Sequence, residues 1–354
     1  MSHLVYSQPS SKTEPLRVGI AGLSHSHVHW ILGRTDRGDV KIVGIAEQNK
    51  ELAQRYADQY GYPMDMVFSS LDAMLDEVKP DAVLAFNSIY GHLEVVQACA
   101  PKGVHVMVEK PLAVSFDHAL KMKELAEKHQ IHLLTNYETT WYPTNHKAFE
   151  MVGDNAIGKL HKIVVRDGHK GPREIGVNEE FLEWLTDPKL NGGGAIIDFG
   201  CYGANLATWL TKGERPESVY ASTKQLKPEV YPKVDDEATI VVNYAYTQAI
   251  IQASWNWPFS RKDMDLYGNS GYILVDNKSD MRYKTGAKKP QQSLKLDDRQ
   301  YPFDDPFGYL AAVVKGEIIL DKNDLSSLEN NMLVVEILDA AVKSAQSGKV
   351  VKLK

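Results

Sequence analysis

Short apolar runs alternate with helical patterns in the first 140 residues of the chain. The apolar runs, which we interpret as strands, cover residues 17–23, 40–47, 82–87, 105–108 and 132–137. Between them, apolar residues recur at helical spacing over residues 51–60, 92–100 and 116–130. Alternation of strands and helices predicts an α/β fold whose parallel sheet carries helices on both faces.

The pattern changes after Pro143. Apolar and polar residues alternate over residues 237–246 and 248–257, and Thr247 lies in the polar turn between them. Shorter runs at 264–267 and 272–275 flank a glycine-containing turn, so we expect an antiparallel meander with one buried face. The lysine-rich stretch 278–299 reads as an exposed hairpin or loop. Residues 325–347 predict an amphipathic helix that ends at Gly348.

Composition narrows the class of protein. The chain has 354 residues, of which 43% are hydrophobic and 24% charged, so we expect two ordinary globular domains. A net charge of −6 gives no reason to expect a nucleic-acid or membrane partner, and no apolar run reaches the roughly 18 residues of a membrane span. The polar first sixteen residues do not resemble an export signal. With only Cys99 and Cys201, the chain is expected in the reducing cytoplasm.

The first predicted strand leads into a turn at residues 22–27 that reads G-L-S-H-S-H. A dinucleotide-binding turn expects G-x-G-x-x-G, and only its first glycine, Gly22, is present; Ser24 and His27 replace the other two. Backbone N–H groups, the hydroxyls of Ser24 and Ser26 and the helix N-terminus still suit a phosphate group. The alternative is a plain strand–turn–helix with a serine cap.

The second strand ends at Glu47, about twenty-five residues after Gly22, where an acid accepts hydrogen bonds from both ribose hydroxyls of adenosine. Gln48 follows and no arginine is adjacent, which favours NAD over NADP. An acidic cap before Asn49 is the alternative. His25, His27 and His29 suggest a metal site, but no third ligand has obvious spacing. We therefore expect capping, packing and cofactor contact there, and no metal.

Two further segments carry candidate chemistry. Lys110, in the sequence Glu109-Lys110-Pro111, directly follows a buried strand, and the carboxyl ends of parallel strands are where open α/β sheets bind ligands. The glycines at 192–194 precede Asp198, and Tyr202 and Asn205 follow about one and two helical turns later on the same predicted helix face. Such a stripe suits a polyhydroxy substrate and a proton relay. The alternatives are a solvated lysine at a strand end and an Asp cap beside a buried tyrosine.

From about residue 17 to its end, the chain resembles the Gfo/Idh/MocA oxidoreductases, typified by glucose-fructose oxidoreductase and inositol dehydrogenase. The resemblance rests on the segments 109–111, 192–198, 253–255, 267–271 and 327–348. It implies an N-terminal Rossmann domain and a C-terminal α/β domain with an open, mostly antiparallel sheet. We expect an N-terminal arm at 1–16, an NAD-binding domain at 17–140, a substrate and oligomerisation domain at 141–324, and a C-terminal helix and tail at 325–354 packing near the Rossmann domain.

The resemblance also implies site residues. The family's catalytic lysine and aspartate match Lys110 and Asp198, and its histidine position is Tyr202 here, as in the glucose-fructose oxidoreductase and dihydrodiol dehydrogenase branch. In the family's Asn-x-x-His motif, His92 matches but Ile89 replaces the asparagine. The expected substrate contacts are Asn205, Lys110 and Asp198. The expected cofactor contacts are Gly22, Ser24, His25, Ser26, His27, Glu47, Asn87, His92, Glu109 and Lys110.

These observations predict an NAD(P)-dependent oxidoreductase that moves a hydride between nicotinamide and a hydroxyl-bearing carbon of a sugar or cyclic polyol. Tyr202 is the expected acid or base, with its pKa of about 10 lowered by Lys110 and the cofactor. The alternatives are an NAD-dependent glycoside hydrolase or lyase and a non-catalytic sugar-sensing regulator. A homodimer or homotetramer is expected from aromatic residues on the second sheet, namely Tyr244, Tyr246, Trp255 and Trp257.

Overall fold

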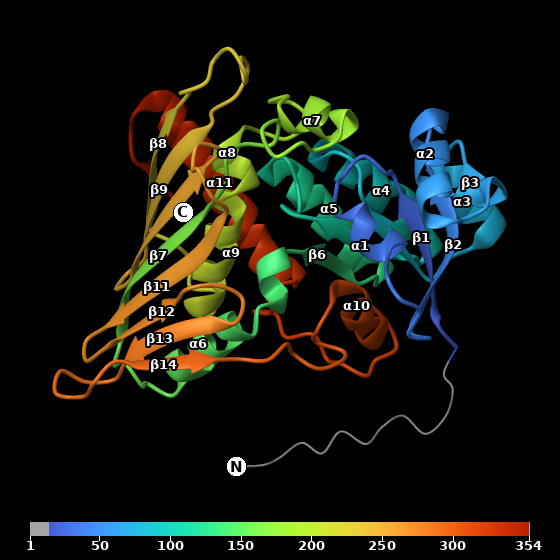
Figure 1. Ribbon diagram of the computed structural model, residues 1–354. Coiled ribbons are helices and arrows are strands. Elements are labelled where there is room, and N and C mark those ends of the chain that lie inside the picture. The colour runs from blue at the N-terminus through green and yellow to red at the C-terminus, as the bar shows by residue number, and fades with distance from the viewer. Residues whose placement is uncertain (1–13, 354) are drawn as a thin grey trace.

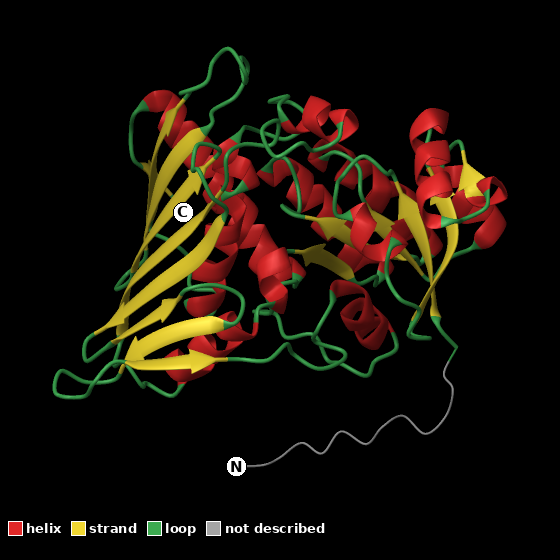
Figure 2. Ribbon diagram, viewed as in Figure 1, coloured by secondary structure: helices red, strands yellow, loops and turns green. Residues whose placement is uncertain are grey.

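The computed structural model describes residues 14–353, so residues 1–13 of the expected N-terminal arm and residue 354 lie outside it. Two sheets lie on opposite sides of a layer of helices (Figures 1 and 2). The expected α/β fold, a Rossmann-type sheet followed by a mixed and mostly antiparallel sheet, is confirmed. Among the described residues, no helix combines the length and apolar character that a membrane crossing needs.

Within the described chain, six parallel strands form the N-terminal sheet in the order β3-β2-β1-β4-β5-β6. They are β1 (Leu16–Ala21), β2 (Val40–Ala46), β3 (Val67–Phe68), β4 (Ala82–Ala85), β5 (His105–Glu109) and β6 (Leu133–Asn136). The associated helices are α1 (Val28–Leu32), α2 (Lys50–Tyr60), α3 (Leu71–Val78), α4 (His92–Cys99) and α5 (Phe116–His129). Short 3₁₀ turns lie at Met64–Met66, Ile89–Gly91, Ala100–Lys102 and Glu138–Trp141. The sequence pattern did not reveal β3, because a two-residue strand shows no period, and α3 was not predicted either.

The strand order reverses between β1 and β4, and ligands of open α/β sheets bind at such a reversal. Gly22 follows β1 there with φ of +79°, a backbone conformation that side chains rarely adopt. A Cβ atom on Gly22 would lie 2.9 Å from the Cβ of Asn87, just after β4. Glycine is therefore required at this position, although the rest of the glycine-rich pattern is missing.

Nine strands of the described chain form the second sheet, in the order β14-β13-β12-β11-β7-β10-β9-β8-β15. They are β7 (Leu160–Gly168), β8 (Ser218–Lys224), β9 (Glu237–Asn243), β10 (Gln248–Ser254), β11 (Arg261–Gly268), β12 (Tyr272–Val275), β13 (Asp280–Lys284), β14 (Gln292–Lys295) and β15 (Val351–Lys352). The expected simple meander is wrong, because β7 lies between β10 and β11 and pairs with β10 in parallel. The expected hairpin within 278–299 is confirmed by β13 and β14.

Helices cover one face of this sheet, and the other face is open (Figure 1). The covering helices are α6 (Pro143–Gly153), α8 (Ala195–Asp198), α9 (Gly200–Leu210) and α11 (Leu328–Ser347). Burial alternates along β9 and β10, as one covered face requires. Tyr244 and Trp255 lie in the core with 4% and 0% exposure, so they do not contribute to the open face as expected. Tyr246, in the turn between the strands, is 46% exposed.

The last helices return to the Rossmann domain. α10 (Pro306–Val314) packs Phe307 and Leu310 into the core formed with Val18 of β1. The expected boundary at residue 324 therefore places α10 in the wrong domain. α11 joins both cores, because Val335 belongs to a Rossmann cluster and Leu338 to the core of the second domain.

Candidate active site

A cavity of about 1020 Å³ lies at the carboxyl end of β5, where the Rossmann domain meets the second sheet. The phosphate-type turn after β1, the loop after β5, helices α8 and α9, and strands β7 and β11 all contribute to its walls. The polar and aromatic residues on the inner side of the sheet that line it are His25, Ser26, His27, Lys110, Glu138, Tyr142, His169, Asp198, Tyr202 and Lys262.

The cavity continues past the ends of the strands onto the open face of the sheet. Lys262 pairs with Asp167 in the register of β11 and β7, and the next pair is Asp263 with Arg166. Successive residues of a strand point to opposite faces, so Lys262 faces inward and Asp263 outward. The outward groups form their own ion pairs, with Arg166 bonded to Asp263 at 3.0 Å and to Asp265 at 2.8 Å. We therefore consider only the inward residues as the candidate site.

Lys110 and Asp198 form a buried ion pair at the centre of the inner part. Nζ of Lys110 lies 2.5 Å from Oδ1 of Asp198 and 3.0 Å from its backbone carbonyl. The indole N–H of Trp255 donates to Oδ2 of Asp198 at 2.9 Å. Burial acts to raise the pKa of Asp198, but Lys110 outweighs it and holds that pKa below its ordinary value. Burial acts to lower the pKa of Lys110, and Asp198 in turn holds it above its ordinary value. Both groups are therefore charged at neutral pH.

Tyr202 lies beside this pair on α9 and is 2% exposed. Asp198 ends α8 rather than opening a helix as expected, but the break at Phe199 still leaves Asp198 and Tyr202 on the same cavity wall. The expectation that the pKa of Tyr202 lies below its ordinary value is wrong for this structure. Burial first, and then the charges of Glu138 and other acidic groups, raise that pKa well above its ordinary value. Tyr202 is therefore protonated at neutral pH.

Sequence reasoning missed a second lysine–carboxylate pair in the same cavity. Nζ of Lys262 donates to Oε2 of Glu138 at 2.6 Å, and the hydroxyl of Tyr142 donates to the other oxygen of Glu138. Nζ of Lys262 also lies 4.3 Å from the ring centroid of Tyr202. We had expected the strand to begin at residue 264, whereas β11 begins at Arg261. Extending the alternation by three residues would have placed Lys262 on the buried face.

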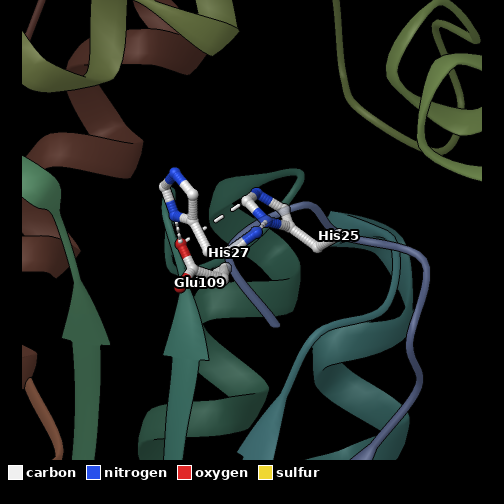
Figure 3. A group of neighbouring side chains, drawn as sticks. All are labelled: His25, His27 and Glu109. Atoms are coloured by element: carbon white, nitrogen blue, oxygen red, sulfur yellow. Dashed lines mark hydrogen bonds and ion pairs between the residues drawn. The ribbon is translucent and has the colours of Figure 1, made fainter. Parts of the chain in front are cut away.

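His25, His27 and Glu109 form a cluster whose ligand-type atoms lie within 4.8 Å of one another (Figure 3). Oε2 of Glu109 lies 2.8 Å from Nδ1 of His27 and 4.0 Å from Nε2 of His25. Burial acts to raise the pKa of Glu109, but the two histidines and the amide of Asn136 lower it to about 2. An ionised Glu109 accepts its hydrogen bond from a protonated Nδ1 of His27. The third group that the sequence pattern did not identify is thus Glu109.

The directions of the hydrogen bonds in this cluster oppose a metal ion. Nδ1 of His25 accepts the backbone N–H of His27 at 3.0 Å, so the proton of the neutral imidazole resides on Nε2. Burial lowers the pKa of His25 well below its ordinary value, which keeps the ring neutral. A protonated Nε2 has no lone pair for a metal ion. His29 lies apart, because its Nδ1 is 2.7 Å from the hydroxyl of Tyr60.

His27 instead offers an acceptor to the cavity. Its ring stacks on Trp30 at 3.8 Å between centroids, and Glu109 fixes its orientation through Nδ1. Figure 3 shows the second ring nitrogen pointing away from Glu109. This nitrogen, Nε2, carries the lone pair when Nδ1 carries the proton. His27 lines the cavity, so a hydroxyl placed there has a hydrogen-bond acceptor at this ring.

A second cavity of about 650 Å³ lies on the other side of the turn after β1. Gly22, Ser24, Glu47 and Asn87 line it, as expected for cofactor contacts. Both oxygens of Glu47 accept backbone N–H groups at 2.8 Å, which fixes its carboxylate at the end of β2. Oδ1 of Asn87 is buried and has no hydrogen-bond partner within the described chain. A polar ligand in this cavity would satisfy that atom.

Helix α7 (Glu179–Leu185) covers the turn between the two cavities. The indole N–H of Trp184 donates to the hydroxyl of Ser24 at 3.1 Å, and the ring of Phe181 lies 4.7 Å from that of His25. The remaining expected cofactor residues His25, Ser26, His27 and Lys110 lie in the larger cavity. The residues expected to bind one dinucleotide thus line two cavities on either side of a turn. Sequence reasoning did not identify α7.

Three expected contacts do not line either cavity. Asn205 is completely buried and donates to the carbonyl of Leu325 at 2.8 Å, so it does not contact substrate. His92 is also completely buried, and its Nδ1 lies 3.1 Å from the carbonyl of Leu112 behind the loop that holds Lys110. Glu109 lies behind His27. Lys110, Asp198 and Tyr202 do meet in one cavity, and their catalytic roles stay predictions.

Known proteins resemble the whole chain. The chain is 24% identical over 316 residues to the trans-1,2-dihydrobenzene-1,2-diol dehydrogenase of Xenopus tropicalis, covering 86% of this chain and 90% of that protein. It is 24% identical to D-xylose 1-dehydrogenase (NADP(+)) 2 of Haloferax volcanii, covering 95% and 99% of the two chains. The crystal structure of an inositol dehydrogenase homolog complexed with NAD+ from Azotobacter vinelandii superimposes with a TM-score of 0.82 at 17% identity, covering 96% and 98%.

Family models match both domains. The model described as "Oxidoreductase family, NAD-binding Rossmann fold" matches residues 16–137, and the model described as "GFO/IDH/MocA C-terminal domain" matches residues 145–274. Together these matches cover most of the chain, in the order expected from the sequence. The Rossmann description agrees with the parallel first sheet, and the boundary between the matches agrees with the change of sheet after β6. The chain belongs to the Gfo/Idh/MocA family of oxidoreductases.

Proposed function

We propose that the protein is an NAD-dependent oxidoreductase that moves a hydride between nicotinamide and a hydroxyl-bearing carbon of a sugar or cyclic polyol. The observation that carries the proposal is the convergence of Lys110, Asp198 and Tyr202 in one cavity beside the dinucleotide-type turn. Family membership supports it, as do relatives named as dehydrogenases of a dihydrodiol and of xylose. When bound, the cofactor would supply the hydride chemistry, and the protein would align the substrate and move the proton.

The residues present fit a dinucleotide. In the smaller cavity, Gly22 allows a phosphate group to approach the backbone closely. Oδ1 of Asn87 has no partner in the described chain and can accept a hydrogen bond from a ligand. The fixed carboxylate of Glu47 can accept hydrogen bonds from ribose hydroxyls. Glu47 also supports a preference for NAD, because it would repel a 2′-phosphate. One solved relative is described with NAD+, and one curated relative is named for NADP(+), so the family alone does not decide the preference.

The protein's own groups can handle the proton of the reacting hydroxyl. Lys110 is a fixed cation, held by Asp198, that would donate a hydrogen bond to the reacting oxygen. Tyr202 is protonated at neutral pH, so we assign it as the acid when a carbonyl is reduced. In the reverse direction the same oxygen acts as the base. Asp198 then serves to hold Lys110 in place.

The dehydrogenase names of the relatives favour net oxidation or reduction over a hydrolase or lyase, and the intact Lys110–Asp198 pair disfavours a regulator without chemistry. The test is a screen of sugars, inositols and glycosides with added NAD, followed by absorbance of NADH. We expect stoichiometric NADH formation with at least one polyol. Substrate consumption without any NADH, or binding without consumption, would contradict the proposal.

We also propose a homo-oligomer formed through the open face of the second sheet. The open face carries partly buried apolar residues, such as Val241 and Ile250, beside the ion pairs of Arg166, and Tyr220 on it is 40% exposed. Uncovered patches of this kind mark interfaces. Sedimentation at micromolar concentration tests the proposal, and a monomer of 39.6 kDa would contradict it.

We propose a cytoplasmic location because Cys99 and Cys201 are buried free thiols, which suits a reducing compartment. Fractionation of cells would test this location.

A further inference from the structure

Tyr202 has two lysines beside it, and only one of them belongs to the segments that carry the family resemblance. Nζ of Lys262 lies 4.3 Å from the centroid of the Tyr202 ring, and Nζ of Lys110 lies 5.1 Å from the same point. Lys262 is therefore the nearer cation. Its side chain is 20% exposed and lines the cavity, so it faces the same space as the proposed substrate.

The fold holds Lys262 in this position from two sides. Its place in β11, opposite Asp167 of β7, directs it to the covered face of the sheet. Glu138, in the 3₁₀ turn that follows β6, accepts its hydrogen bond at 2.6 Å. Glu138 is in turn fixed by the hydroxyl of Tyr142. Each of the two lysines thus has its own carboxylate partner, Asp198 for Lys110 and Glu138 for Lys262.

The charged and titratable groups around Tyr202 come from every element packed against it. They are Lys110 after β5, Asp198 of α8, Cys201 of α9, Tyr137 and Glu138 after β6, Asp167 of β7 and Lys262 of β11. Burial raises the pKa of Asp167 well above its ordinary value, and its Oδ1 has no partner in the described chain. Burial thus favours the protonated form of Asp167. The ammonium groups of Lys110 and Lys262 and the carboxylates of Glu138 and Asp198 are the charged groups around the ring.

An opposite charge within about 4–6 Å stabilises the charged form of a group, and this stabilisation becomes larger when water is excluded. Without the charge of Lys262, the Tyr202 phenolate would lie near two carboxylates, Glu138 and Asp198, and only one of the two lysine cations would remain beside it. The phenolate would therefore be less stable. A substrate that fills the cavity excludes water and strengthens the contribution of the nearer cation. The cation over the ring also stabilises the aromatic system through its electron-rich face.

We propose that Lys262 is a positioning residue for the reaction: together with Lys110 it lies beside the ring of Tyr202 and stabilises the phenolate that forms when the proton leaves. Lys262 acts through Tyr202 and transfers no proton to or from the substrate. The inference rests on the proposed role of Tyr202 in proton transfer. The proton moves between the phenol oxygen and the substrate oxygen, and both lysines remain ammonium ions throughout.

The experiment measures the acidity of residue 202 directly, without turnover. A difluorotyrosine, whose hydroxyl is more acidic, is placed at position 202 of the full chain and titrated by ¹⁹F NMR. Lys262→Gln removes the charge but keeps a donor for Glu138, and we expect it to raise the midpoint by about one pH unit. Lys262→Arg should leave the midpoint near that of the wild type. Lys159→Met is the control: Nζ of Lys159 lies 3.5 Å from the ring centroid of the exposed Tyr246, and its removal should not move the midpoint of residue 202.

Turnover supplies a second readout. In the protein with natural tyrosine, Lys262→Gln should move the acid limb of kcat/KM to higher pH by a similar amount. A midpoint that stays in place would overturn the inference, as would an equal loss of kcat/KM at every pH. If Lys262→Gln does not fold, the comparison uses Glu138→Gln against the double variant Glu138→Gln/Lys262→Met, whose difference again isolates Lys262. Absence of any NAD-linked activity would defeat the proposed function and leave the NMR result to decide on Lys262.

Discussion

Lys110 and Asp198 are 88 residues apart in the chain, yet their charged groups meet at 2.5 Å, and each side chain is less than 10% exposed. This contact joins the carboxyl end of β5 in the Rossmann domain to the end of α8 in the second domain. A buried ion pair contributes little net stability when intact, but loss of one partner leaves an uncompensated charge.

Replacement of Asp198 by asparagine should therefore damage both folding and catalysis. We expect a loss of about 3–5 kcal/mol in the free energy of unfolding, because Lys110 would stay buried without a countercharge. Urea unfolding followed by circular dichroism measures it. Asp263→Asn is the matched control, since Asp263 pairs with Arg166 on the open face and should cost about 1 kcal/mol or less. Equal losses in the two variants would contradict the importance of burial.

Tyr202→Phe should lower kcat by about 10²–10⁴-fold while NADH binding changes little, because the variant loses the hydroxyl but keeps the ring. Steady-state kinetics and fluorescence titration with NADH measure the two effects. Tyr137→Phe provides the control: its ring packs on Tyr202 at 5.5 Å, and its own hydroxyl is buried without a partner in the described chain. Near-normal turnover in Tyr202→Phe would show that another group moves the proton.

Glu47→Ala should weaken NADH binding by about tenfold and narrow the gap to NADPH, since the variant loses a charge-assisted hydrogen bond and the repulsion of a 2′-phosphate. Isothermal titration with both cofactors measures this change. Glu94→Ala, in the wall of the same cavity on α4, should leave the ratio unchanged. A wild-type protein that binds NADPH more tightly than NADH would refute the NAD preference.

The buried His92 should make stability depend on pH below neutrality. Burial lowers the pKa of His92 to about 4, whereas an unfolded histidine titrates near 6.5. Between these two pKa values, His92 binds a proton in the unfolded chain but not in the folded chain. The free energy of unfolding therefore falls as the pH drops from about 6.5 to about 4. The contribution is at most about 3 kcal/mol. His92→Asn, which keeps a donor for Leu112, should flatten the dependence relative to the wild type.

Removal of metal ions should have no effect on the cluster of His25, His27 and Glu109, because its hydrogen bonds leave a proton on Nε2 of His25. Thermal unfolding and NADH binding are compared before and after dialysis against a chelator, and again with added Zn²⁺. We expect unchanged melting temperatures in all three conditions. Stoichiometric Zn²⁺ in the purified protein, lost together with stability on chelation, would contradict this assignment.

The sequence was informative where the pattern is local. The parallel strands followed from periodicity, and the tight turn at Gly22 and the place of Lys110 at a strand end followed from the neighbouring residues. That Lys110 and Asp198 belong to one site followed only from the family resemblance. The position of β7 between β10 and β11 could not be predicted in this way, because strand pairing depends on which distant segments bury each other's faces. Lys262 was missed together with the true start of β11.

The pKa of Tyr202 illustrates a different limit. The sequence placed a lysine near it, which predicted a lower pKa, but it did not show that Glu138 and Asp167 also face the ring from elements far along the chain. Asn205 was misassigned for a related reason. Helical spacing placed it on the stripe of Asp198, whereas the break between α8 and α9 at Phe199 turns it toward Leu325.

Helix α11 inserts Val335 into the core beneath the Rossmann sheet and Leu338, less than one turn later, into the core of the other domain. The two domains that enclose the proposed active site are thus both packed on the single helix α11. Neither domain is complete before α11 has been synthesised and has packed against both cores. Either part without α11 would leave apolar residues of its core uncovered, so we expect the cofactor-binding and substrate-binding parts to unfold together.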